Sequence, residues 1–208
     1  MDEALWAVGR GTGIVGLALI TVSVVLGSLT RSGRPAFGLP RFAVTLVHRN
    51  AAILGTVFIL IHIITLFFDP YAQLELIDFV VPFLGEANPI WLGLGTVAFD
   101  LLIAVMITGL LRNRIGRRPF RLVHWATYAM WPIALVHALG TGTDAASAAF
   151  LIFAAACTAA VLAALIWRLT PRFGRYDNPQ PSPSMAMVPP RIGRPPRTGT
   201  PTTAGSRT

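Results

Sequence analysis

Charged residues and cysteine are scarce in this chain of 208 residues. Only 12% of the residues are charged, while 54% are hydrophobic, and soluble domains carry about twice that share of charge. So few polar side chains cannot shield so large an apolar core from water, which excludes an ordinary soluble domain. The single cysteine, Cys157, excludes an internal disulfide and a cysteine-ligated zinc or iron–sulfur site. Lysine is absent, so all 17 Lys+Arg residues are arginine.

Five hydrophobic stretches are long enough to cross a bilayer as helices, since about 20 apolar residues span its hydrocarbon core of about 30 Å. They run over approximately residues 5–29, 44–68, 89–111, 122–139 and 145–169. The first begins after two acids and is too long for a secretory signal, so we expect a retained helix. The alternating pattern of membrane strands is absent. The predicted fold is an all-α integral membrane bundle of about five transmembrane helices.

The arginines predict the orientation of the bundle in the membrane. Eleven of the arginines follow the first, third and fifth spans, namely Arg31, Arg34 and Arg41, then Arg112, Arg114, Arg117, Arg118 and Arg121, then Arg168, Arg172 and Arg175. The second and fourth connections carry acids instead, namely Asp69, Glu75, Asp78, Glu86 and Asp144. Because arginine-rich loops stay in the cytoplasm, we expect the N-terminus outside and the C-terminus inside a bacterial plasma membrane. The second and fourth spans then run parallel.

Two segments lie outside the predicted spans. Residues 69–88 contain the apolar run 74–84, which is too short to cross, so we expect it to lie along the outer surface or to insert halfway. Residues 171–208 hold nine of the sixteen prolines and cannot bury enough apolar surface to offset chain entropy. We therefore predict a transmembrane domain over residues 1–170 and a disordered, Pro/Arg-rich cytoplasmic tail over residues 171–208.

All four histidines lie within the predicted spans. His48 and His62 occupy positions i and i+14 of the second span, and His124 and His137 occupy positions i and i+13 of the fourth. Ionisable residues inside a span are costly and usually mark a functional site. For one histidine alone, a hydrogen bond to a neighbouring helix is an equal alternative. Two pairs at matching spacing on parallel helices make that alternative a poor explanation for all four.

The depth of the histidines favours two separate sites. At 1.5 Å per residue, His62 and His137 lie about 20 Å further from the arginine-rich ends than His48 and His124, which excludes a single four-histidine metal site. Parallel helices pair His48 with His124, and His62 with His137. Two histidines suit an iron already held by four porphyrin nitrogens, because bare zinc or copper requires further ligands. We predict two stacked b hemes with these histidines as axial ligands.

The helical phase fits this prediction only for the second span. An i, i+14 spacing returns His62 to within about 40° of His48 around the helix axis. An i, i+13 spacing leaves His124 and His137 about 140° apart on an ideal helix. Pro132 lies between them, and we expect the kink at this proline to turn His137 toward its heme.

Four further residues have candidate roles. Heme propionates need cationic partners, and Arg10 lies near the outer level while Arg49 lies near the inner one. Snorkelling to the membrane surface is an equal alternative for Arg49. Gly55, midway between His48 and His62 in the sequence, leaves room for porphyrin edges or for a helix contact. Asp100, in the middle of the third span, either relays protons or bonds a helix neighbour, and we favour the structural role.

The paired spacing resembles the ferric reductase-like transmembrane domain family. The matching motifs are His-x13-His at His48 and His62 and His-x12-His at His124 and His137, within a resemblance over about residues 10–168. The family includes NADPH oxidases, ferric reductases and the heme-bearing membrane partner of periplasmic methionine sulfoxide reductase. The resemblance implies that these histidines ligate two hemes that carry electrons outward. Many members have six spans, and the flavin and nicotinamide domains of full reductases have no counterpart here.

These observations predict an oxidoreductase subunit that transfers electrons through the membrane to an acceptor outside. The tail over residues 171–208 is too short for a flavin or nicotinamide domain, so we expect the donor to be a separate cytoplasmic flavoprotein or a membrane quinol. Two alternatives stay open: a heme-containing anchor or assembly subunit without turnover, and a histidine-lined metal or proton transporter. The other expected partners are the lipid bilayer and an extracytoplasmic acceptor, but not nucleic acid.

Overall fold

The computed structural model describes residues 2–30, 38, 40–70, 74–85, 88–142 and 145–170. All of them belong to one unit, Met1–Asp177. The predicted disordered tail lies outside the described residues, as do Arg31, Arg34, Glu86 and Asp144. The described residues form helices and no strand, which confirms the predicted all-α fold.

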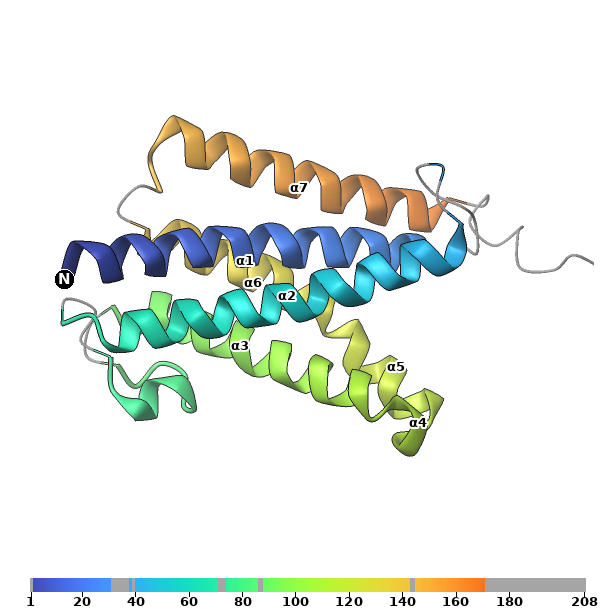
Figure 1. Cartoon of the computed structure of the whole chain (residues 1–208), viewed down its shortest axis with the longest axis horizontal. Helices are drawn as coiled ribbons and strands as arrows, with labels where there is room; N and C mark the ends of the chain where they lie inside the picture. The colour runs from blue at the N-terminus through green and yellow to red at the C-terminus, as the bar shows by residue number, and fades with distance from the viewer. Residues whose placement is uncertain are drawn as a thin grey trace, which may run out of the picture. The chain divides into compact units, whose positions relative to one another are not determined.

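The described helices run back and forth between the two ends of the bundle (Figure 1). Four crossings are single helices: α1 (Asp2–Thr30), α2 (Arg41–Phe67), α3 (Pro89–Leu110) and α7 (Ala148–Leu169). The remaining crossing is divided into α5 (Arg117–Trp125) and α6 (Thr127–Thr141), preceded by the short α4 (Arg112–Ile115). A 3-10 helix, η1 (Leu76–Phe79), lies between α2 and α3. Five helical stretches of the described residues are long and apolar enough to cross a membrane, as predicted.

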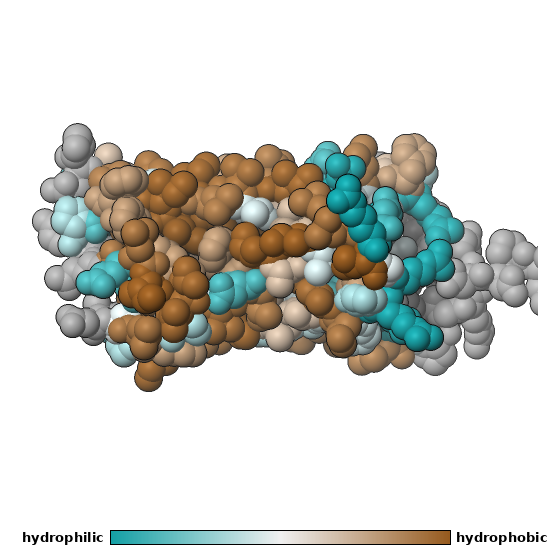
Figure 2. All heavy atoms as spheres, turned by 90° about the horizontal axis from the view of Figure 1, so that it is seen from below, coloured by the Kyte–Doolittle hydropathy of each residue, from teal (hydrophilic) through white to brown (hydrophobic). Residues whose placement is uncertain are grey.

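The two ends of the bundle differ in charge. We call the end where α2 and α5 begin the arginine end, because Arg41, Arg112, Arg114, Arg117, Arg118, Arg121 and Arg168 lie there. The opposite, acidic end carries Asp69, Glu75 and Asp78. Between the ends, large apolar side chains are exposed along the helices, such as Ile64 and Ile152. Figure 2 shows this apolar surface on one face, with hydrophilic side chains gathered at the end where α4 and α5 lie. The chain is a membrane protein.

Helix α1 is the central helix of the bundle. It packs along the length of α2 and also contacts α6 and α7, while α3 packs mainly on α6. Glycines permit the close approach of α1 and α2. A Cβ added at Gly16 would lie 2.6 Å from Ile59, and one added at Gly55 would lie 3.2 Å from Ile20. Gly55 therefore serves the helix contact, one of the two roles that its position predicts.

The interior between the helices is apolar, and a buried hydrogen bond crosses it. Its buried cluster consists of Ile20, Val24, Leu102, Met130, Trp131, Cys157 and Val161. The indole Nε1 of Trp131 donates to Thr21 Oγ1 at 2.8 Å, and Thr21 donates in turn to the Leu17 carbonyl at 2.7 Å. This chain of hydrogen bonds ties α6 to α1 at mid-depth and satisfies the only polar atom of the indole.

The fourth crossing is interrupted at Ala126 rather than at Pro132. The Ala126 N–H donates to the Val123 carbonyl at 2.9 Å, three residues back, and α6 begins at the next residue. Pro132 lies inside α6, which continues past it, and the kink expected at this proline stays a prediction. Because His124 lies on α5 and His137 on α6, the ideal-helix angle of about 140° between them does not apply.

Candidate functional site

The structure brings His48 and His124 together near the arginine end. Their ring centroids are 6.3 Å apart, and the rings are nearly perpendicular, at 85°. The His124 ring also stacks on Phe120, one turn earlier on α5, with centroids 5.0 Å apart and an angle of 27°. Both histidines are half-buried. We call His48 and His124 the inner pair.

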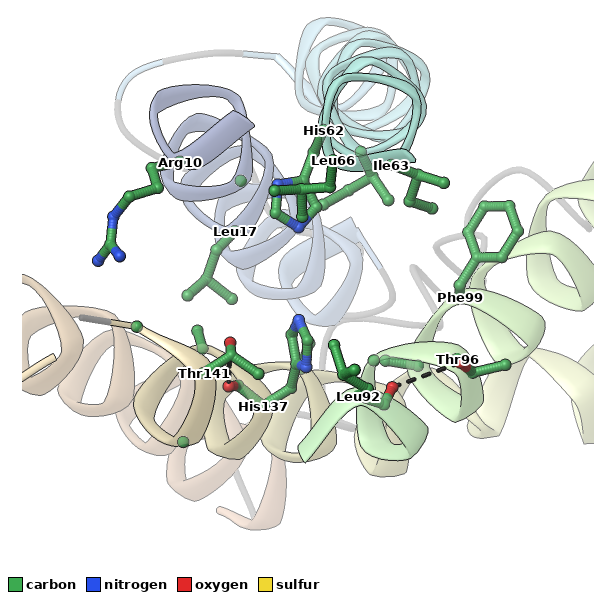
Figure 3. Close-up of a pocket in the computed structure, with 18 of the residues that line it drawn as sticks. Arg10, Leu17, His62, Ile63, Leu66, Leu92, Thr96, Phe99, His137 and Thr141 are labelled. Atoms are coloured by element: carbon green, nitrogen blue, oxygen red, sulfur yellow. Dashed lines mark hydrogen bonds between the residues drawn. The ribbon is translucent and has the colours of Figure 1, made fainter. Parts of the chain in front are cut away.

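His62 and His137 line one cavity nearer the acidic end, and we call them the outer pair. The cavity has a volume of about 490 Å³ and lies between α1, α2, α3 and α6, in the range of about 300–1,000 Å³ typical of small-molecule and cofactor sites. Its walls are mainly apolar, with Leu17, Ile63 and Phe99 among them. In Figure 3 the two rings point toward one another from opposite sides of this cavity.

Backbone carbonyls fix the orientation of three of the four rings. Nδ1 lies 2.8 Å from the Ser23 carbonyl in His48, 2.6 Å from the Gly9 carbonyl in His62 and 2.8 Å from the Trp91 carbonyl in His137. A carbonyl oxygen can only accept, so Nδ1 is the protonated nitrogen in each ring. The other nitrogen, Nε2, therefore keeps its lone pair for a metal, which is the usual arrangement of histidine ligands.

Glycines on neighbouring helices make room for the same three rings. A Cβ added at Gly27 would lie 3.0 Å from the His48 ring, and one added at Gly13 would lie 2.9 Å from the His62 ring. A Cβ at Gly95 of α3 would lie 2.6 Å from the His137 ring. Each imidazole thus lies in a notch between a carbonyl and a glycine. These three glycines were not among the predicted site residues, although Gly13 and Gly27 repeat the i, i+14 spacing of the histidines that they contact.

The two arginines predicted to bind propionates lie in different surroundings. Arg10 lines the cavity of the outer pair, and its guanidinium lies over the Trp6 ring, 5.1 Å from the ring centre. Two buried acids, Asp69 and Asp78, also line this cavity. Of the two arginines, Arg10 lines the described cavity, whereas Arg49 is next to His48 along α2 and is exposed.

A second polar cluster lies near the inner pair at the arginine end. Arg168 of α7 donates to the Tyr128 hydroxyl of α6, and that hydroxyl is 3.1 Å from the Ser28 hydroxyl of α1. The Arg168 guanidinium also lies over the Trp125 ring, 4.6 Å from its centre. Tyr128 follows His124 by about one helical turn, so this cluster joins α1, α5, α6 and α7 beside the inner pair. It was not predicted from the sequence.

The histidines form pairs rather than a larger metal-ligating cluster. Within the described ranges, no three His, Cys, Asp or Glu side chains are grouped as a bare metal ion requires. The i, i+14 spacing of the two histidines on α2 corresponds to about 20 Å of depth at the rise of an α-helix. Two sites stacked along the bundle axis therefore describe the geometry.

Comparison with known families identifies the domain. The family model described as "Ferric reductase like transmembrane component" matches residues 12–135. The chain belongs to this ferric reductase-like family. The match includes His48, His62 and His124 and ends just before His137. No curated protein and no solved structure matches the chain. Membership in the ferric reductase-like family supports a transmembrane oxidoreductase-type role.

Proposed function

We propose that this chain transfers electrons across the membrane through two bis-histidine b hemes, one held by each histidine pair. The observation that carries this proposal is the geometry of the inner pair. Metal–imidazole bonds of about 2.0 Å on either side of one metal separate the ring centres by about 6 Å, and the separation here is 6.3 Å. A separation of this size leaves room for a planar group between the two rings.

The outer pair supports the same proposal through its cavity. An apolar space of about 490 Å³, with two facing imidazoles and with Arg10 among its lining residues, matches the needs of a flat hydrophobic cofactor that carries carboxylates. The protonated Nδ1 atoms leave Nε2 toward this space. The residues present therefore fit a heme at each level.

The chain's own residues position and tune the cofactors. The carbonyls of Gly9, Ser23 and Trp91 hold three rings in one tautomer and orientation, which raises their basicity as ligands. Arg10 and Arg49 would neutralise propionate charge at the outer and inner levels. Bound heme supplies one-electron redox chemistry, while axial ligands, hydrogen bonds and burial set its potential.

The direction of transfer follows from the charge of the two ends. We assign the arginine end to the cytoplasm and the acidic end to the outside, because arginine-rich connections stay inside. Electrons then enter at the inner pair and leave from the outer pair. The donor would be a separate cytoplasmic flavoprotein or a membrane quinol, and the acceptor a molecule on the acidic side.

A heme count is the decisive experiment for this proposal. The chain is purified in detergent, its heme is extracted and quantified, and a reduced-minus-oxidised spectrum is recorded. We expect two b hemes per chain, with distinct potentials. A chain that carries no heme after expression with heme supplementation contradicts the proposal and favours the histidine-lined transporter.

Turnover separates an electron-transfer subunit from a heme-containing anchor. The chain is reconstituted in vesicles with a reductant inside and ferric citrate or ferricyanide outside. Sustained reduction of the outside acceptor, lost in His62→Leu, supports electron transfer. Two hemes that reduce with dithionite but pass no electrons to either acceptor support the anchor instead.

A further inference from the structure

Asp100 lies at the centre of a membrane-spanning helix and on its outer surface. It is the twelfth of the 22 residues of α3, so about 15 Å of helix separates it from either end. Its side chain is exposed, whereas Ala98 and Leu102 on either side of it are buried. A carboxylate is therefore directed away from the bundle at the depth of the bilayer centre.

The opposite side of α3 is the one that holds the outer pair. Gly95 and the Trp91 carbonyl contact His137, and α3 packs on α6 along this side. At 100° per residue, Gly95 lies about 140° around the helix from Asp100, and Leu102 lies about 160° from it.

Nothing within the described part of the chain compensates the Asp100 charge. No hydrogen bond or ion pair there reaches its carboxylate, and the residues that share its stripe toward the C-terminal end of α3 are Ala104 and Ile107. Toward the N-terminal end the stripe holds Thr96, whose hydroxyl donates to the Asp78 carbonyl. A charged aspartate at the centre of a span costs about 2.5–3.5 kcal/mol on the insertion scale. Intramembrane acids are for this reason almost always paired or turned toward a bundle interior.

We infer that the Asp100 stripe of α3 is the docking surface for a transmembrane helix of another protein, one that carries an arginine or lysine at mid-depth. Charge complementarity selects this partner, because each charge alone is costly in hydrocarbon and the pair is neutral. Ala104, one turn from Asp100, lets a second helix approach closely. Lipid headgroups cannot reach this depth.

A second copy of the chain is a weaker occupant of this surface. A two-fold contact through the stripe would set Asp100 against Asp100, which places like charges together in a medium of low dielectric constant. The exposed cation Arg49 lies on α2, so a second copy would bring it to Asp100 only through a head-to-tail contact between different helices. Because α3 also positions the His137 ring, a helix docked on Asp100 would be joined to the outer pair through one rigid element.

The test uses the full chain in phosphatidylcholine vesicles and synthetic transmembrane peptides. The probe is a labelled Leu/Ala helix of spanning length with a single central arginine, and the matched control peptide has leucine at that position. We expect energy transfer to show about tenfold tighter association of the arginine peptide. Asp100→Asn should abolish this preference, and Asp100→Glu should keep it.

Moving the acid tests whether depth matters. In the double variant Asp100→Leu, Ile107→Asp the carboxylate shifts two turns toward the arginine end on the same face. This variant should prefer a peptide whose arginine is shifted by the same two turns. Equal binding of the central and shifted peptides by both forms would show non-specific attraction and would overturn the proposal.

A crosslinking experiment in the native membrane completes the test. A photo-crosslinking residue at position 107 should join the chain to a membrane protein whose spanning helix has a central cation, and Asp100→Asn should remove that product. If the product is a second copy of the chain and is lost in Arg49→Leu, the surface is a contact between copies and the proposal is wrong. These readouts need no heme, so their failure leaves the proposed electron transfer untouched.

Discussion

The inner and outer histidine pairs are built from one shared helix and two separate ones. α2 is continuous and supplies His48 and His62, so their i, i+14 spacing determines both phase and depth. Their partners, His124 and His137, lie on α5 and α6, on either side of the interruption at Ala126. A single helix imposes one register on two sites, whereas a divided helix lets each ligand be placed independently.

The two pairs also differ in how open they are. The rings of the inner pair already lie at the separation of two ligands on one metal, 6.3 Å between centroids, while the outer pair faces a cavity that is also lined by Arg10 and Asp78. The inner pair therefore depends on ring position, and the outer pair depends more on what lines its cavity. Substitutions can separate these dependences.

Removing a ligand should produce the largest difference between the pairs. If each pair holds a heme as proposed, His48→Leu and His124→Leu should each lose the same heme, and His62→Leu and His137→Leu the other, because each variant removes one of the two histidines that would hold it. Redox titration of purified variants measures which spectral component disappears. The double variant His48→Leu, His124→Leu should lose no more than either single variant. A match between His48→Leu and His137→Leu would contradict the pairing.

Filling a glycine notch should have the next largest effect. Gly95→Ala places a methyl group 2.6 Å from the His137 ring, and overpacking of this kind costs about 1–3 kcal/mol, which weakens outer heme binding about tenfold or more. Gly27→Ala, at 3.0 Å from His48, should weaken the inner heme less. Heme retention after dialysis against apomyoglobin is the measurement.

Two glycines provide matched controls for these notches. Gly109 lies on α3 like Gly95, and Gly11 lies on α1 like Gly27, and a Cβ at either meets nothing within 4 Å. Gly109→Ala and Gly11→Ala should leave both hemes bound. Loss of heme from these variants as well would show that the cause is helix propensity or insertion rather than ring position.

Removing a propionate partner should shift one potential by a modest amount. Arg10→Gln should lower the potential of the outer heme and Arg49→Gln that of the inner one, because a cation favours the more negative reduced state. A partly exposed ion pair of about 0.5–1 kcal/mol corresponds to about 20–40 mV for one electron. A shift of both potentials by either variant would place that arginine between the sites.

A substitution at a residue that lies between the two histidine pairs should affect heme binding at both pairs equally and only slightly. Trp131→Phe removes the hydrogen bond to Thr21, which is worth about 1 kcal/mol. Thr21→Val should cost about 1–3 kcal/mol, since it leaves the buried indole N–H unsatisfied. Thermal unfolding of the purified chain measures both, and the heme ratio should stay constant. Selective loss of one heme would assign Trp131 to that site.

The membrane spans and the pairing of histidines at equal depth could be predicted from the sequence. Both depend only on numbers of residues, namely the length of each apolar run and the spacing of the histidines. Apolar run length predicts a helix that spans the membrane, and the described part of the chain holds five helices that are long and apolar enough to do so. The interruption at Ala126 could not be predicted, since Thr127 and its neighbours carry no strong helix-breaking signal and the nearest proline lies more than a turn further on. Pro132 stays inside α6, as prolines in membrane helices can.

The glycine notches around the histidine rings could not be predicted from the sequence, for a different reason. Whether a glycine faces a histidine depends on the rotation of two helices about their axes, which residue spacing within one helix does not determine. Gly13 and Gly95 look like other small residues in apolar runs until α1 and α3 are placed. The exposure of Asp100 also depends on how the helices pack. The hydrogen bond from Asp100 to a neighbouring helix, which the sequence favoured, is absent among the described residues.

The carbonyl anchors have a consequence for the order of synthesis. Gly9 and Ser23 precede His62 and His48 in the chain, and Trp91 precedes His137. During translation each of these imidazoles thus follows its own hydrogen-bond acceptor into the membrane. The second helix to emerge can orient both of its rings against the first, before the helices that complete either pair have been made. Half of each site is thereby prepared in the nascent hairpin, ahead of any cofactor.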